Sequence, residues 1–397
     1  MKKILMLGGA ATQTPPIRYA HSQGHFVIVC DYNNNPPGRM AADKFIQVST
    51  TDLDSILDVA IDNEIDAILT YASDPAAPTV AYVGNKLGLP SNPYESVKLL
   101  ANKDLYRQFL DEHGFNTPKF HCVSNIDDAR VAFANLNTPI VVKPTDSSGS
   151  KGVTVINDSN ELIEAIRWAL SFSRAKKVIL EEFVELLDYQ IAGDGFIYDG
   201  KLVFRCFANE HFNDSCNGLV PVGESFPSIY SEDIQNKVHE ETQRLIDLLA
   251  LKFGAINFDV RIGKNDRVFL MEIGPRNGGN LIPEVTKYAT GVDMIKYTVD
   301  AALGIDCSEI EMKPVEGFYS SFIFHSTEDG VLETIEFDNK INNKFIQKNL
   351  SVNQGDVVPK FLGSNCTLGT GILKFESRSE MIEFMDDTQQ CIKVIVH

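Results

Sequence analysis

Strand-like and helix-like segments alternate through the first hundred residues, and this alternation constrains the fold most strongly. Short apolar runs predict strands, and runs with apolar residues at helical spacing predict helices between them. In chain order the segments are strand 2–9, helix 15–24, strand 25–33, helix 53–65 and strand 66–73. Strands that alternate with helices predict a doubly wound parallel sheet with helices on both faces. Ligands of such sheets bind at the carboxyl ends of the strands, where Gly8, Gly9, Asp31 and Asp74 lie.

The loop after the first strand, MLGGAATQTPP, lacks the GxGxxG spacing of a dinucleotide-binding turn. The sequence therefore argues against an NAD- or FAD-dependent oxidoreductase. We expect Gly9, Thr14 and Asp74 to contact a small substrate instead. The alternative, in which the glycines only permit a tight turn, stays open at this point.

The rest of the chain predicts further mixed units and no internal repeat. The segments are a helix pair near 95–112, a hairpin over 139–156, a helix over 161–174, a strand over 177–185, two strands over 188–208, a helix that ends at Gly254, and a hairpin over 256–273. A mixed α+β region follows, with a helix near residues 377–388. We expect domains over residues 1–103, 104–184, 185–303 and 304–397.

Composition excludes several classes of protein. A net charge of −18 argues against nucleic-acid binding, which requires many lysines and arginines on phosphates. Seven scattered cysteines without CxxC spacing argue against structural zinc and a disulfide framework. No apolar run reaches the roughly 18 residues of a membrane helix, and the short run near the N-terminus is better explained as a strand than as a signal peptide. We therefore expect no membrane partner and a cytoplasmic location.

The hairpin VVKPTDSSGSKGVTVI, residues 141–156, joins two strand-like runs through a loop of serines and glycines. The loop lies between strands and lacks the GK[ST] end of a Walker motif. Its SxxK match has no accompanying SDN or KTG. Small residues leave backbone N–H groups free to approach phosphates, and Lys143 would add a fixed positive charge. An exposed hairpin with a lysine at its edge is the alternative.

A second hairpin, INFDVRIGKNDRVFLMEI, presents carboxylates on one face. A four-residue turn GKND would place Ile262 opposite Arg267 and Asp259 opposite Leu270, so Glu272 becomes the diagonal neighbour of Asp259. The core face would then contain Phe258, Val260, Ile262, Phe269, Met271 and Ile273. Two carboxylates at this separation reach a common Mg²⁺ ion, although a solvated face with incidental acids is the alternative.

Two further segments complete the pattern. Arg276 and Asn277 follow Glu272 in a glycine-rich turn, and an arginine fork at this place suits phosphoryl charge, with a surface salt bridge as the alternative. The strand VILEEFVE could line an adenine slot: Glu181 would accept from the exocyclic amine and the backbone of Val184 would meet the ring edge. Asp188 could accept the ribose hydroxyls.

The order of these segments resembles the ATP-grasp superfamily over about residues 1–303. The likeness is greatest to the branch of biotin carboxylase, the carbamoyl-phosphate synthase large chain, the purine-pathway ligases and the L-amino-acid ligases. This resemblance implies ATP held between two α+β subdomains, with Mg²⁺, or Mn²⁺ as a substitute, on Asp259 and Glu272. It implies catalytic roles for Arg276 and Lys143. The residues expected to bind ATP are Lys103, Lys143, Ser147, Ser148, Gly149, Ser150, Lys151, Gly152, Glu181, Glu182, Phe183, Val184, Asp188 and Leu270.

The resemblance implies an ADP-forming ligase that activates a small carboxylate as an acyl phosphate and joins it to an amine or amino acid, and a homodimer. Candidate acceptor contacts include Asn277, together with His211 and Glu224 in an expected loop over residues 207–228. This chain departs from the family pattern in two places: Gly274 replaces an asparagine metal ligand, and Asp259 replaces a longer Glu or Gln. The alternatives are a non-catalytic nucleotide-binding protein and a carboxylase or carbamoyl-phosphate-synthase type of enzyme, although RNGG stands where carboxylases have V-E-H.

Overall fold

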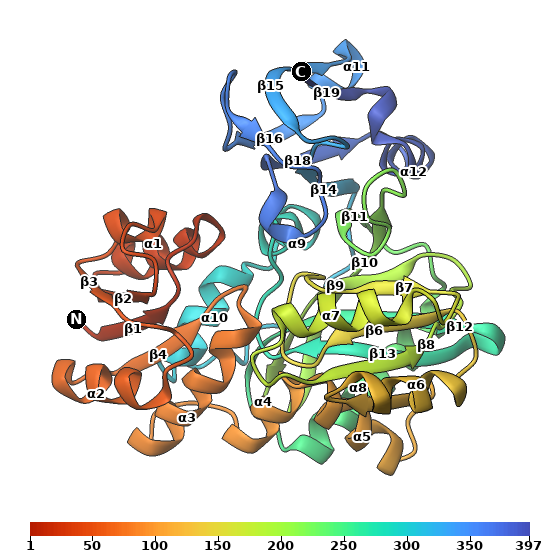
Figure 1. The fold of residues 1–397 in the computed structure, drawn as a ribbon. Coiled ribbons are helices and arrows are strands. Elements are labelled where there is room, and N and C mark those ends of the chain that lie inside the picture. The colour runs from red at the N-terminus through yellow and green to blue at the C-terminus, as the bar shows by residue number, and fades with distance from the viewer.

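Four β-sheets organise the chain in the computed structural model, which describes residues 1–397 (Figure 1). The N-terminal sheet is parallel, with the strand order β3-β2-β1-β4. Its strands are β1 (Lys3–Leu7), β2 (Phe26–Asp31), β3 (Lys44–Gln47) and β4 (Ala67–Thr70). Its helices are α1 (Thr14–Ser22), α2 (Leu53–Asn63) and α3 (Ala77–Leu87). The predicted doubly wound sheet is confirmed, and β3 and α3 are additional to the elements that the sequence predicts.

The two faces of this sheet have separate apolar cores. Ile17 and Ala20 of α1 pack on one face together with Val299 and Ala302 of a much later helix, α10 (Met294–Ala302). Helices α2 and α3 cover the other face. A distant segment of the chain therefore completes the N-terminal domain and fixes it against the domain that follows.

The second sheet is small and antiparallel, with the order β5-β8-β6-β7. Its strands are β5 (Phe120–Val123), β6 (Ile140–Pro144), β7 (Thr154–Ile156) and β8 (Val178–Glu182). Helices α6 (Ile126–Ala134) and α7 (Leu162–Phe172) cover one face. Helices α4 (Tyr94–Leu100) and α5 (Lys103–Glu112) connect the N-terminal domain to this unit. The predicted hairpin over residues 139–156 is confirmed as the β6–β7 pair.

The third sheet has eight strands in the order β13-β12-β9-β10-β11-β14-β18-β16. Its strands are β9 (Gln190–Tyr198), β10 (Lys201–Phe212), β11 (Pro221–Phe226), β12 (Gly254–Gly263), β13 (Arg267–Gly274), β14 (Phe318–Phe324), β16 (Phe345–Leu350) and β18 (Gly369–Phe375). Helices α5 and α8 (Glu232–Leu249) contribute to the core on one face, and α9 (Ile282–Thr290) and α10 to the core on the other. The sheet includes β14, β16 and β18, which lie beyond the expected boundary at residue 304. The four expected domain ranges stay predictions.

The remaining strands form a three-stranded sheet that projects from the rest of the molecule (Figure 1). Its strands are β17 (Val357–Val358), β15 (Gly330–Phe337) and β19 (Ile392–Val396), and the helices α11 (Asn339–Asn342) and α12 (Arg378–Asp386) accompany it. Its apolar core also takes in Phe322 and Phe324 of β14, so this region is joined to the large sheet through packing as well as through the chain.

The end of the long helix α8 differs from the prediction. The helix ends at Leu249 instead of Gly254, and Ala250 takes a left-handed conformation with φ of 50°. Leu249 and Leu251 both pack in the core under the large sheet. Because the chain must turn between them to bury both side chains, the helix stops before the glycine, which begins β12 instead.

The predicted loop over residues 207–228 is wrong for most of its length. Strand β10 continues to Phe212 and pairs with β11, so only residues 213–220 connect them. Strand β11 is also paired on its other side with β14. That partner lies about a hundred residues further along the chain, and a local pattern does not reveal it.

The β12–β13 hairpin has a different register from the prediction. Ile262 pairs with Val268 instead of Arg267, because Asn265 and Asp266 both adopt left-handed conformations in a three-residue turn. Such conformations are tolerated best by Gly, Asn and Asp. A β-bulge then shifts the register again, so that Asp259 faces Glu272 directly instead of Leu270. The core face contains Val268, Leu270 and Ile273 instead of Phe269 and Met271.

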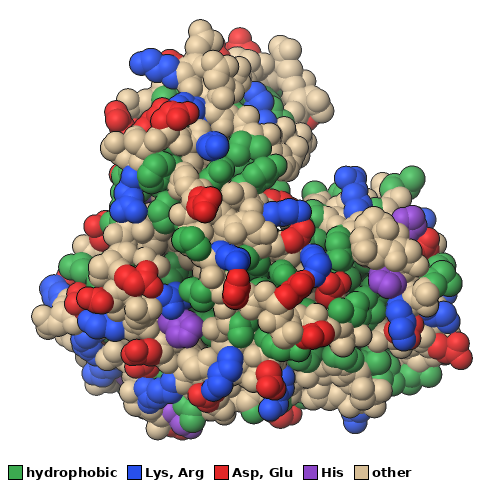
Figure 2. Space-filling view, turned by 180° about the vertical axis from the view of Figure 1, so that it is seen from behind, with side chains coloured by type: hydrophobic (Ala, Val, Ile, Leu, Met, Phe, Trp, Pro, Cys, Tyr) green, Lys and Arg blue, Asp and Glu red, His purple; other side chains and the backbone are tan.

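Charged side chains of both signs are interspersed on the face of the molecule that Figure 2 shows. Neither Lys and Arg nor Asp and Glu form a continuous patch there. None of the helices combines the length and the apolar character required to span a membrane.

Candidate functional site

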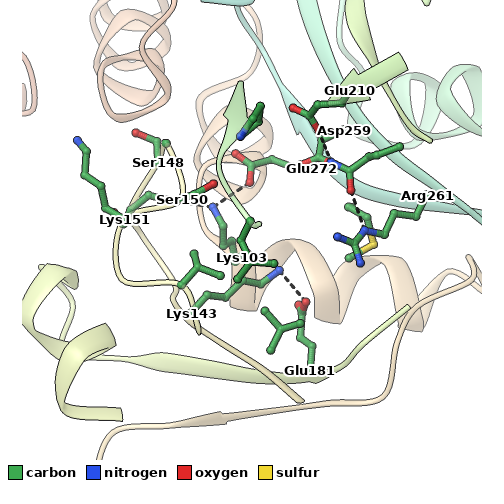
Figure 3. Close-up of a pocket in the computed structure, with 18 of the residues that line it drawn as sticks. Lys103, Lys143, Ser148, Ser150, Lys151, Glu181, Glu210, Asp259, Arg261 and Glu272 are labelled. Carbon is green, nitrogen blue, oxygen red and sulfur yellow. Dashed lines mark hydrogen bonds and ion pairs between the residues drawn. The ribbon is translucent and has the colours of Figure 1, made fainter. Parts of the chain in front are cut away.

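A pocket between the small antiparallel sheet and the eight-stranded sheet encloses about 870 Å³, part of it open to solvent (Figure 3). We call it the central pocket. It brings together twelve of the residues predicted to bind nucleotide or metal, from segments as far apart in the sequence as Lys103 and Glu272. They are Lys103, Lys143, Ser147, Ser148, Gly149, Ser150, Lys151, Glu181, Glu182, Val184, Asp259 and Glu272.

Four residues predicted to bind nucleotide lie outside the lining of this pocket: Gly152, Phe183, Asp188 and Leu270. The side chain of Leu270 is buried in the core, and its neighbour Met271 lines the pocket instead. Asp188 is exposed, and Phe183 lies under the guanidinium of Arg261, 4.8 Å from it. Their roles stay predictions.

Lys143 belongs to β6 and lies beside a fully buried carboxylate. Its Nζ is 2.6 Å from Oε2 of Glu181, whose side chain is only 1% exposed. The other oxygen, Oε1, accepts from Nε of Arg107 at 2.8 Å. Burial by itself would raise the pKa of Glu181, but the charges of Arg107 and Lys143 lower it to about 2. Glu181 is therefore held by two cations, an arrangement that favours positioning of Lys143 over the predicted contact with an adenine amine.

Lys103 is the first residue of α5 and connects the lid to the carboxylate pair. Its Nζ lies 2.9 Å from Oε2 of Glu272 and donates to the backbone oxygen of Ser147 at 3.0 Å. Its own backbone N–H donates to Thr145. The start of this helix thus fixes one end of the β6–β7 loop and places a positive charge between that loop and β13 (Figure 3).

Asp259 and Glu272 lie opposite each other on β12 and β13. Oδ1 of Asp259 is buried without a hydrogen-bond partner. Buried polar atoms usually have a partner, so this oxygen is available to a bound cation. Burial and the neighbouring charge of Glu272 raise the pKa of Asp259 to about 6. No group of three or more His, Cys, Asp or Glu side chains is placed to hold a metal. The pair therefore fits Mg²⁺ only in the arrangement where phosphates and water supply the other ligands.

The β6–β7 loop, residues 145–153, forms the lid of the pocket. Gly149, Ser150 and Gly152 all have left-handed backbone conformations, with φ of 66°, 56° and 76°. The lid also touches the C-terminal region, since the N–H of Ser364 donates to the carbonyl of Gly149 at 3.4 Å. Lys151 points away from Lys103 and Lys143 (Figure 3).

The pocket contains polar residues that the sequence reasoning missed. Arg261 donates to Gln190 at 2.7 Å and to the backbone oxygen of Val184 at 3.0 Å. Gln190 in turn donates to Glu210. These residues come from three neighbouring strands, so no local pattern gathers them. Arg107 was also missed, although it lies four residues after Lys103 and therefore on the same face of α5.

Arg276 lies outside the lining of the central pocket, in the lining of a separate smaller cavity, and connects β13 to the N-terminal domain as a clip through Asp74. Its guanidinium makes two hydrogen bonds of 2.7 Å with the carboxylate of Asp74 and one of 2.8 Å with Asn257. Gly274 lies under this pair: a Cβ there would be 2.9 Å from Oδ1 of Asp74 and 3.1 Å from Cζ of Arg276. The clip therefore gives a physical reason for glycine at position 274.

The other predicted substrate residues are dispersed. Thr14 lines a second cleft of about 1420 Å³, which residues 278–281 and strands β16 and β18 also border. The backbone N–H of Gly9 donates to Asp31. Asn277 is fully buried and accepts from Thr298. Glu224 is 6% exposed and its carboxylate has no hydrogen-bond partner, whereas His211 is bonded to both Asp386 and Ser225.

Asp194 on β9 gives a prediction for stability. Its Oδ1 accepts from Asn257 and from the N–H of Gly278, but burial raises its pKa from 3.8 to about 7. Between these values the unfolded chain has released the proton and the folded chain keeps it. Stability therefore falls as the pH rises through this range, by at most about 1.4 kcal/mol per pH unit. The free energy of unfolding, measured with urea at several pH values, should depend less on pH in Asp194→Asn than in wild type. The control Asp199→Asn, at an exposed position, should keep the wild-type pH dependence. The same pH dependence in wild type and both variants would contradict the prediction.

Comparison with known proteins agrees with the geometry. Residues 136–284 match the family model described as the ATP-grasp domain. This range contains the lid, Glu181 and the carboxylate pair. The chain thus contains a domain of the ATP-grasp family, as the resemblance predicted.

Among curated proteins, the chain is 28% identical over 240 residues to the carbamoyl phosphate synthase large chain of Thermoanaerobacter sp. (strain X514), covering 59% of this chain and 21% of that one. It is 27% identical over 270 residues to the alanine–anticapsin ligase of Bacillus amyloliquefaciens, covering 62% and 56%. The chain thus spans about a fifth of the length of the synthase relative. The L-amino acid ligase of Bacillus licheniformis has the same fold, with a TM-score of 0.82 at 19% identity over 100% of this chain and 99% of that one.

Proposed function

We propose that this protein is an ADP-forming ligase that uses ATP to join a small carboxylic acid to an amine or an amino acid. The observation that supports this most is the convergence of Lys103, Lys143, Asp259 and Glu272 under a serine- and glycine-rich lid. No side chain of the central pocket is a cysteine or a histidine. The site is therefore suited to positioning and charge neutralisation, which are the main requirements of phosphoryl transfer.

ATP would lie in the central pocket with its phosphates under the lid. Lys103 and Lys143 would hold the phosphate oxygens, and Asp259 and Glu272 would hold Mg²⁺, which when bound neutralises phosphate charge. A carboxylate oxygen of the acid attacks the γ-phosphorus, and the bond to ADP breaks. The amine nitrogen then attacks the acyl carbon, phosphate leaves as the C–N bond forms, and the amine releases its proton.

Arg276 is proposed to stabilise the charge on the acyl phosphate. It lies four residues after Glu272 and at one end of the turn over residues 276–280, part of which borders the second cleft. A guanidinium at this place would meet both the transferred phosphoryl group and the acid, because its planar fork binds two oxygens at once. The second cleft is the proposed site of the acid or the amine.

An ADP-release screen tests this function. The protein is incubated with ATP and Mg²⁺ over pools of carboxylic acids combined with pools of amines and amino acids. We expect release that requires one acid and one amine together, and we expect Glu272→Ala to lower it at least about 100-fold, because a charge-stabilising group is lost. Tight ATP binding without release from any pool would instead indicate a non-catalytic nucleotide-binding protein. Release that requires bicarbonate would indicate a carboxylase or carbamoyl-phosphate-synthase type of enzyme.

A further inference from the structure

Arg107 is the most deeply buried cation near the central pocket, with a side chain that is 1% exposed. Its three nitrogens use separate partners. Nε donates to Glu181 at 2.8 Å, Nη1 to the carbonyl of Leu270 at 3.3 Å and Nη2 to the carbonyl of Met271 at 3.2 Å. One guanidinium thus connects β8 of the small sheet to β13 of the large sheet.

The two carbonyls lie at the β-bulge that sets the geometry of the carboxylate pair. Val260 pairs with Leu270, but Asp259 pairs with Glu272, so Met271 is the extra residue of the bulge. Strand β13 is at the edge of its sheet, so its outward backbone groups have no neighbouring strand. Successive carbonyls of a regular strand point in opposite directions. Leu270 and Met271 both reach Arg107 because the bulge turns the chain between them.

Without the bulge, the two metal-binding carboxylates would lie on opposite faces of the sheet. The regular register from Val260 and Leu270 would place Asp259 opposite Met271 and Glu272 opposite Phe258. Directly opposed residues of two paired strands point to the same face of the sheet, and neighbouring residues of one strand point to opposite faces. Glu272 would therefore point into the core with Phe258, on the face opposite to Asp259. The bulge is therefore a condition for Asp259 and Glu272 to face one ligand.

We propose that Arg107 is a positioning residue that maintains this bulge and through it the metal-binding geometry of Asp259 and Glu272. The same guanidinium holds Glu181, and Glu181 holds Lys143, so Arg107 also fixes the lysine on the other side of the pocket. Arginine suits this place because its rigid fork serves three acceptors in fixed directions, whereas a lysine ammonium is a compact charge on a flexible stem. The metal-binding role of the two carboxylates rests on the proposed function, but the bulge and its contacts do not.

Metal affinity separates positioning from a general loss of stability. We would measure the dissociation constant of Mn²⁺ by electron paramagnetic resonance, in the presence of ADP, for wild type and Arg107→Lys. We expect Arg107→Lys to weaken Mn²⁺ binding about tenfold or more, the usual effect of losing a group that orients metal ligands. The matched control is Leu110→Ala, on the same helix and fully buried in the core under the large sheet but outside the Arg107 contacts. It should lower the melting temperature and leave Mn²⁺ affinity within about twofold.

Two further variants keep the test decisive if Arg107→Lys does not fold. The double variant Arg107→Met with Glu181→Gln removes both partners of the buried pair, so the Arg107–Glu181 pair is not broken from one side only. It should weaken Mn²⁺ binding more than Glu181→Gln alone, in which the contacts of Arg107 with the carbonyls of Leu270 and Met271 remain. Equal Mn²⁺ affinities in the Arg107 variants and Leu110→Ala would overturn the proposal, as would a wild-type protein that binds no Mn²⁺. Because these readouts need no turnover, failure of the ligase screen would leave them intact.

Discussion

Replacing Lys143 with methionine should lower kcat/KM for ATP about 100-fold, whereas the same change at Lys151 should lower it less than about fivefold. Lys143 is held on β6 by the buried carboxylate of Glu181, so its charge has a fixed position in the pocket proposed to hold the phosphates. Lys151 is at the tip of the lid and points away from this position in Figure 3. A pre-oriented charge contributes far more to phosphoryl transfer than a mobile one.

The comparison between the two lysines contains its own control, because both changes remove one positive charge from the same pocket. Calorimetric titration with ATP and Mg²⁺, together with the rate of ADP release, measures binding and turnover separately. Similar, small effects of both substitutions would contradict the assignment of Lys143. A larger effect of Lys151→Met than of Lys143→Met would indicate that Lys151, in the lid, contacts the phosphates.

Substituting Arg276 with lysine should lower amide formation about 100-fold, with ADP affinity within about threefold of wild type. Lysine keeps the charge but cannot reproduce the two bonds to Asp74 and the bond to Asn257. Nucleotide binding should persist because Arg276 is not in the lining of the central pocket. The measurements are product formation with a fixed acid–amine pair and calorimetric titration with ADP.

Asp74→Asn distinguishes a catalytic arginine from a simple clip between domains. If Arg276 contacts the reacting groups, Asp74→Asn should lower amide formation only about tenfold, because the guanidinium of Arg276 keeps its position without the ion pair. If the two variants lose equal activity, Arg276 serves as a clip alone. Arg205→Lys is a suitable control, since Arg205 is also largely buried and paired with an acid, Glu232, but lies outside the central pocket.

The fold was predictable to the extent that its patterns are local. Strands with continuous apolar runs, helices with apolar stripes and the β6–β7 hairpin all follow from residues close together in the sequence. The misassigned segment over residues 207–228 shows the limit. Its strands are stabilised by β9 and β14, and the pairing of β11 with β14 joins Gly223 to Phe322 across about a hundred residues. Pairing at that distance leaves little local signal.

The sequence predicted many of the residues that line the central pocket, but not the geometry of the site. The sequence selected Lys103, Lys143, Asp259 and Glu272, and the structure brings them together. The predicted register placed Asp259 and Glu272 as diagonal neighbours, whereas the bulge makes them direct partners. Turn conformation and a single extra residue set this register, and neither leaves a periodic trace in the sequence.

The sequence by itself determined the kinds of group available for chemistry: lysines before a loop of serines and glycines, carboxylates on a hairpin and an arginine after them. Only the tertiary structure decided their partners. Glu181 is held by Arg107 and Lys143, and Arg276 is held by Asp74 from another domain. Local composition selects residue types because backbone conformation and side-chain chemistry are local properties. Partners of buried charges are chosen by packing across the whole chain, because a charge removed from water must find its counter-charge wherever the fold places it.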